Sequence, residues 1–127
     1  MQTHEIEIRV RYQETDAQGR VHHANYLTWF ELGRVELLRA LGCSYRRLED
    51  EGFFLVVAEV SVEYLRPAFF DDLLRLQTTT VRAKGASIHH AYQVFRDRDT
   101  LARGASKIAC IDRQNKITKL PAWLRLS

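Results

Sequence analysis

The sequence predicts a two-layer α+β domain in which one long helix lies against a single antiparallel sheet. Three observations lead to this fold class. A strand pattern occupies residues 4–12, a helical pattern follows over residues 24–41, and four further strand patterns run consecutively from residue 53 to residue 112. Consecutive strands joined by tight turns pair antiparallel, and a sheet with one buried face needs a covering layer. We therefore expect a five-stranded sheet that curls around the helix.

The first strand is recognised by alternation with a period of two. Ile6, Ile8 and Val10 alternate with charged residues such as Glu7 and Arg9. This pattern is typical of a half-buried strand with one face toward the core. A polar loop follows over residues 13–22.

The long helix is recognised by apolar residues at helical spacing. These are Tyr26, Leu27, Phe30, Leu37, Leu38 and Leu41, with Trp29 and Leu32 widening the stripe. Asn25 or His23 is expected to begin the helix, and Gly42 to end it. The stripe is wider than one sheet can cover, so we expect a second subunit to cover part of it. Ser44 then opens a short second helix that ends near Gly52.

The remaining strands are expected at residues 53–65, 73–82, 87–96 and 101–112. Pro67 ends the first of them, and turns at residues 84–85, 96–99 and 113–115 separate the others. A short tail, residues 116–120, is cut by Pro121. There is no linker, repeat or low-complexity segment, so residues 1–127 are expected to form a single domain.

Composition excludes several classes of protein. A formal charge of +3 with dispersed basic residues does not predict nucleic-acid binding. No run of about 18 apolar residues predicts a membrane span. Cys43 and Cys110 lie far apart, and the first residues lack a signal-peptide pattern. We therefore expect free thiols and a cytoplasmic protein.

A motif in the loop and the helix start carries a resemblance to a known family. Its positions are Tyr12, Thr15, Asp16, Gly19, Val21, His23 and Tyr26. The motif resembles the signature of hotdog-fold acyl-CoA thioesterases, most closely the 4-hydroxybenzoyl-CoA thioesterase and YbgC-like branch. Residues 62–68 and the pair Asp71-Asp72 extend the resemblance. It implies a hotdog fold, in which a curved five-stranded antiparallel sheet wraps a long central helix.

The resemblance implies a catalytic role for Asp16 and His23. Asp16 would attack the thioester carbon or activate a water molecule, and these alternatives stay open. An aspartate before a helix is otherwise a common turn residue. A histidine stands at the position of His23 in the YbgC-like branch, and its backbone N–H with the helix dipole would polarise the thioester carbonyl. His22 is expected to lie near the site without a role of its own in the reaction.

The resemblance also implies a set of substrate-binding residues. Gly19 permits a tight turn and close approach of the backbone to a ligand. Asn25 and Tyr26 match the family's helix start, where Asn25 is expected to hold the loop and Tyr26 to pack in the core beside the acyl pocket. Basic and polar residues at strand ends, Arg66, Lys84 and Ser87, are candidates for contact with coenzyme A.

The sequence contains residues that suggest two other kinds of site. A second hotdog branch uses a helix glutamate, but Glu31 and Glu36 are expected to be solvent-facing and paired with Arg34 or Arg39. His89 and His90 point to opposite faces of a strand and have no metal-ligand spacing with other residues. The sequence therefore predicts no metal and no cofactor.

The expected function is hydrolysis of an acyl-CoA thioester to a free acid and coenzyme A, by a homodimer or homotetramer. One alternative is an acyl carrier protein thioesterase of a polyketide-type pathway, in which that carrier protein would be a partner. Another is a non-catalytic acyl-CoA binding protein.

Overall fold

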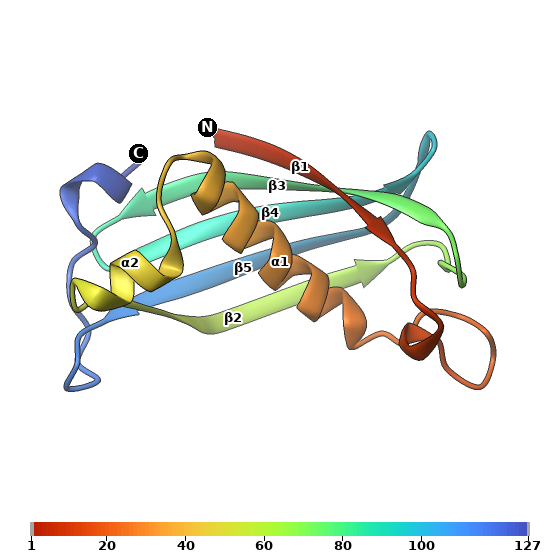
Figure 1. The fold of residues 1–127 in the computed structure, drawn as a ribbon, viewed down its shortest axis with the longest axis horizontal. Helices are drawn as coiled ribbons and strands as arrows, with labels where there is room; N and C mark the ends of the chain where they lie inside the picture. Colours follow the sequence, from red (N-terminus) through yellow and green to blue (C-terminus); the bar gives the residue numbers. More distant parts are fainter. Residues whose placement is uncertain (1, 127) are drawn as a thin grey trace.

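The computed structural model describes residues 2–126, and their backbone forms one curved sheet with a long helix on its concave face. The strands are β1 (Gln2–Arg9), β2 (Phe54–Tyr64), β3 (Leu73–Lys84), β4 (Ser87–Arg96) and β5 (Asp99–Ile111). Their order in the sheet is β1-β3-β4-β5-β2, and all neighbours pair antiparallel. The predicted five-stranded antiparallel sheet is confirmed (Figure 1).

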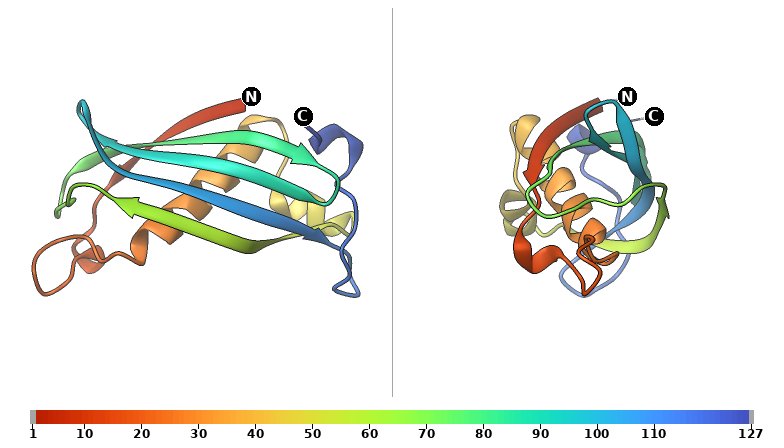
Figure 2. Two further views of the ribbon diagram at one scale, coloured as in Figure 1. Left: turned by 180° about the vertical axis from the view of Figure 1, so that it is seen from behind. Right: turned by 90° about the vertical axis from the view of Figure 1, so that its right-hand side faces the viewer.

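The two predicted helices are present as α1 (Asn25–Ala40) and α2 (Tyr45–Asp50). Ser44 caps α2, because its side chain accepts a hydrogen bond from the backbone N–H of Arg47 at 3.1 Å. The end-on view in Figure 2 shows the sheet curling around α1. No helix within residues 2–126 is long and apolar enough to cross a membrane.

The first strand is shorter at its end than its alternation predicts. β1 ends at Arg9, and residues 12–14 form a 3₁₀ turn instead of continuing the strand. The pairing of β1 with β3 also ends there, with Arg9 opposite Leu73. The turn redirects the chain toward the start of α1 and buries Glu14, a residue that the sequence pattern placed in a polar loop.

The core lies between α1 and the concave face of the sheet. Trp29 and Phe30 are almost fully buried, and the Phe30 ring stacks on Tyr92 of β4 with centroids 4.1 Å apart. Gly33 allows the helix to approach the sheet, because a Cβ atom at this position would collide with the side chain of Thr78. The middle of α1 therefore packs directly against β3.

One edge of the sheet remains apolar and exposed. On β2, Val57, Val60 and Tyr64 are 51%, 41% and 48% exposed, respectively. Val57 and Val60 pair with Ile108 and Ser106, whose side chains are buried, so these valines lie on the concave side. An apolar edge strand of this kind is a ready surface for pairing with another chain.

Candidate active site

The loop between β1 and α1 holds Asp16 in a tight, well-bonded turn. Asp16 Oδ1 accepts hydrogen bonds from the backbone N–H groups of Gln18 at 2.8 Å and Arg20 at 3.2 Å. Gly19 completes the turn with a φ of 80°, a left-handed conformation that favours glycine. The turn-residue interpretation of Asp16 is therefore correct for Oδ1. It leaves Oδ2 without a hydrogen-bond partner among residues 2–126.

The start of α1 presents a free backbone donor beside this loop. The N–H of Ala24 donates to His22 Nδ1 at 3.1 Å, and that of Asn25 donates to the His22 carbonyl at 3.0 Å. The N–H of His23 donates to no acceptor in the described part of the chain. Unsatisfied N–H groups at a helix start attract negative charge on a ligand. His22 thus has a structural role at the helix start that sequence analysis did not assign.

Tyr64, at the end of β2, fixes the backbone of His23. Its hydroxyl donates to the His23 carbonyl oxygen at 2.8 Å. Its ring also meets the ring of Tyr26 edge to face, with centroids 5.1 Å apart. Tyr26 is 3% exposed, and burial, together with the neighbouring Tyr64, raises the pKa of its hydroxyl to about 12. Tyr26 therefore keeps its hydroxyl proton at neutral pH.

These residues surround a cleft of about 270 Å³. Its lining includes Asp16, His23, Tyr26 and Arg66 from the predicted site, together with Arg20, Val21, Tyr64, Leu65 and Pro67. A carboxylate and the start of a helix thus meet in one cleft with two arginines at its wall. Arg66 pairs with Asp99 at 3.4 Å, and both side chains are about half exposed, so this ion pair contributes little to stability.

The other predicted binding residues lie outside this cleft. Asn25 donates from Nδ2 to the carbonyl oxygen of Glu14 at 2.9 Å, so it holds the loop against the helix. Lys84 and Ser87 face each other in the register of β3 and β4. Their turn lies at the opposite end of the sheet from the loop that carries Asp16 (Figure 1).

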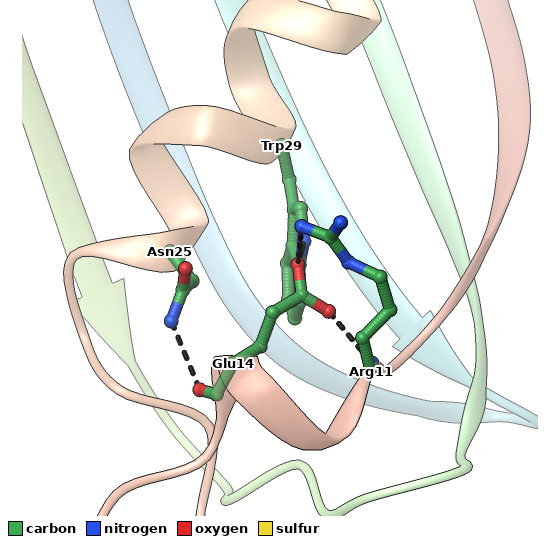
Figure 3. Close-up of polar contacts among 4 residues, drawn as sticks. All are labelled: Arg11, Glu14, Asn25 and Trp29. Carbon is green, nitrogen blue, oxygen red and sulfur yellow. Dashed lines mark hydrogen bonds and ion pairs between the residues drawn. The ribbon is translucent and has the colours of Figure 1, made fainter.

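Glu14 is a site residue that sequence analysis missed. It is 3% exposed, and each of its carboxylate oxygens accepts a hydrogen bond (Figure 3). Oε1 accepts from the backbone N–H of Arg11 at 2.7 Å, and Oε2 accepts from Trp29 Nε1 at 2.9 Å. The Glu14 carbonyl also accepts from the backbone N–H of His22 at 2.8 Å. Glu14 therefore ties the loop to α1 two residues before Asp16.

The two helix glutamates do not line the cleft. Glu31 is exposed on α1, and Glu36 forms an ion pair with Arg39 one turn away. The interpretation of these residues as surface charge is consistent with both positions. Glu36 has the expected partner Arg39, but the expected pairing with Arg34 is wrong, because Arg34 is buried and forms no ion pair within residues 2–126. Among the described residues that line this cleft, Asp16 is the one that carries a carboxylate.

Comparison with known proteins agrees with this architecture. Residues 10–126 match the family model of the thioesterase-like superfamily. The acyl-CoA thioesterase YbgC of Haemophilus influenzae is 38% identical over 106 residues, covering 83% of this chain and 78% of that protein. A DHNA-CoA thioesterase from Staphylococcus aureus superposes with a TM-score of 0.91 at 28% identity, covering 98% of this chain and 85% of that one. A Bartonella henselae structure described as a probable thioesterase has a TM-score of 0.88 at 34% identity, covering 94% and 99%. The chain therefore belongs to the thioesterase-like superfamily and is a hotdog-fold enzyme of the thioester-hydrolase class.

Proposed function

We propose that the protein hydrolyses acyl-CoA thioesters at the cleft between the Asp16 loop and the start of α1. The observation that carries this proposal is that the Asp16 carboxylate and the free N–H of His23 belong to the same cleft. Acyl transfer needs a group that attacks or activates water, and a donor for the carbonyl oxygen that becomes negative. This cleft offers both.

Two chemical routes fit this arrangement. In one, Asp16 Oδ2 attacks the thioester carbon, the C–S bond breaks, and water then hydrolyses the mixed anhydride. In the other, Asp16 takes a proton from a water molecule that attacks the same carbon. In both routes coenzyme A leaves as the thiol or thiolate, and the helix start at His23 stabilises the oxyanion.

The binding of coenzyme A is proposed to involve two subunits. Arg20 and Arg66 at the cleft wall are suited to phosphate groups. Lys84 and Ser87 flank the β3–β4 turn, at the opposite end of the same subunit's sheet. A two-fold dimer formed by antiparallel pairing of two β2 edges brings opposite ends of the two sheets together. In such a dimer, Lys84 and Ser87 of the second copy lie at the same end as the Asp16 cleft of the first copy.

Charge placed on the β2 edge is expected to break this dimer. Val57 is 51% exposed and Val60 is 41% exposed. Lysine at both positions puts two like-charged side chains on this apolar edge. Light scattering should then report a species near the chain mass of 14.8 kDa instead of a multiple of it. The rate of thiol release from an acyl-CoA substrate should also fall in this double variant, because the proposed site needs both subunits.

The matched control for the β2 edge is lysine at Ile117. This residue is 74% exposed and lies outside the edge strand. The control should keep both the mass and the activity. An unchanged mass in the Val57 and Val60 double variant would contradict a dimer through β2. The subunits would then associate through another surface.

A panel of thioesters tests the function itself. Purified protein is assayed for thiol release from short-chain, long-chain, benzoyl and hydroxyaromatic CoA esters, the last because the Staphylococcus relative is named for DHNA-CoA. We expect one class to be hydrolysed at a kcat/KM of about 10⁴ M⁻¹s⁻¹ or more. Slow hydrolysis of every CoA ester, followed by fast hydrolysis of an acyl carrier protein thioester, would favour the carrier-protein alternative. Tight binding of CoA esters without hydrolysis would favour the binding protein and overturn the proposal.

A further inference from the structure

A second, smaller cavity lies between the C-terminal half of α1 and the concave face of the sheet. Its volume is about 20 Å³, and leucines of α1 form much of its wall. Five polar side chains from five elements also line it: Gln2, Arg34, Tyr45, Thr80 and His90. It shares no lining residue with the cleft at Asp16. The proposed thioesterase mechanism makes no use of it.

Arg34 is a buried cation in this cavity without a carboxylate partner in the described part of the chain. The residue is 8% exposed, and residues 2–126 supply no ion pair to it. Arg34 Nη1 donates to the Tyr92 hydroxyl at 3.1 Å, and that hydroxyl lies 2.5 Å from Ser106 Oγ. Hydroxyl groups satisfy a hydrogen bond but do not neutralise a charge. Burial of a charge is costly unless an opposite charge accompanies it.

The protonation states leave the cavity with a net positive charge. Burial lowers the pKa of Arg34, but the neighbouring hydroxyls of Tyr92 and Tyr45 raise it above its ordinary value, so the guanidinium stays charged. His90 is 7% exposed, and burial together with Arg34 and His89 lowers its pKa to about 3. His90 is therefore neutral at pH 7. Its Nδ1 has no hydrogen-bond partner within residues 2–126.

We propose that this cavity binds one monatomic halide anion, of which chloride is the physiological member, at the Arg34 guanidinium. A cavity of about 20 Å³ has room for a single water-sized body. Phosphate and carboxylates are larger, so the size selects a monatomic ion. The Thr80 and Tyr45 hydroxyls are available as further donors on the same wall. The attraction between Arg34 and an anion is strengthened by the low dielectric of the core.

Bromide is the probe for this site, because it replaces chloride and gives an anomalous diffraction signal. Crystals of the protein grown in sodium bromide should show an anomalous peak within hydrogen-bond distance of the Arg34 guanidinium. Crystals of Arg34→Met should lack that peak. Bromide peaks on the protein surface alone would mean an adventitious ion only and would overturn the proposal.

A thermal titration gives an independent measurement in solution. Bromide replaces gluconate at constant ionic strength and fixed protein concentration, and the Tm is followed. Binding to the folded state alone should raise the Tm by about 3–6 °C at five times the Kd, and the Tm should then keep rising with the logarithm of the bromide concentration. A wild-type Tm that does not rise in this way would contradict the site.

Two variants and a control complete the experiment. Arg34→Met should abolish the rise in Tm, whereas Arg47→Met, at an exposed arginine of α2, should keep it. If Arg34→Met does not fold, Thr80→Val serves instead, and loss of one hydrogen bond should raise the bromide Kd fitted to the Tm curve about threefold to tenfold. An unchanged Kd in Thr80→Val, with no anomalous peak in the wild-type cavity, would overturn the proposal.

Discussion

Replacement of Asp16 by asparagine is expected to lower kcat by about a hundredfold to ten-thousandfold while leaving the fold intact. Asp16 Oδ1 accepts the two backbone hydrogen bonds that hold the turn, and an asparagine oxygen can accept the same two bonds. The substitution changes only Oδ2, which becomes an amide nitrogen without nucleophilic or basic character. Steady-state kinetics on the best substrate of the panel, with a thermal melt of both proteins, checks both halves of this expectation.

The chain contains a matched control for this substitution. Asp112 forms the same turn: its Oδ1 accepts from the backbone N–H groups of Gln114 at 2.8 Å and Lys116 at 3.0 Å. It stands outside the cleft at the start of α1. Asp112→Asn should therefore leave kcat unchanged. Near-normal kcat in Asp16→Asn would remove Asp16 from the catalytic role. An equal loss in both variants would assign the effect to turn geometry instead of the carboxylate.

The Asp16 and Asp112 turns show how far sequence patterns reach. Both aspartates are good turn residues, and local pattern alone cannot separate them. The family motif singled out Asp16, and the fold then supplied what a linear sequence lacks: the helix start and Tyr64 of β2 on the same cleft. The elements themselves were predictable because their apolar periods, two for the strands and helical for α1, are strong over many residues.

The parts that could not be predicted depend on contacts between distant residues. Glu14 looks like a polar loop residue, and its burial follows from an acceptor requirement of Trp29, fifteen positions further on. In the sequence Tyr64 is an ordinary aromatic residue of a strand. Only the fold shows that its hydroxyl donates to the His23 carbonyl oxygen. Lys84 and Ser87 are candidates for contact with coenzyme A from their place at strand ends, but the length of the strands places their turn at the other end of the sheet.

Glu14→Gln is expected to weaken both stability and turnover. Both carboxylate oxygens of Glu14 accept an N–H, one from Arg11 and one from Trp29. Glutamine has a single acceptor oxygen. Its amide NH2 group would therefore face the N–H of either Arg11 or Trp29, and two donors cannot form a hydrogen bond with each other. A buried donor left without a partner costs about 1–3 kcal/mol in free energy of unfolding. The Arg11 ion pair adds little, because that side chain is 61% exposed.

The expected kinetic effect follows from what Glu14 holds in place. Its carbonyl accepts from the His22 N–H and from Asn25 Nδ2, so one residue joins the Asp16 loop to the helix start. A shift of about 1 Å between reacting groups can cost about a hundredfold in rate. We therefore expect kcat to fall more than KM rises, when both are measured well below the Tm of the variant.

Trp29→Phe separates positioning from general destabilisation. It removes the indole N–H and keeps an aromatic ring in the core, whereas Glu51→Gln disturbs only an exposed ion pair with Arg47. The Glu14 and Trp29 single variants should each lower kcat. Their double variant should lose less than the sum of the two, because one hydrogen bond links both residues. Glu51→Gln should match the wild-type protein. A Glu14→Gln variant with a lowered Tm but wild-type kcat would limit Glu14 to stability, and the geometry of the Asp16 cleft would then be set by the Asn25 and Tyr64 contacts alone.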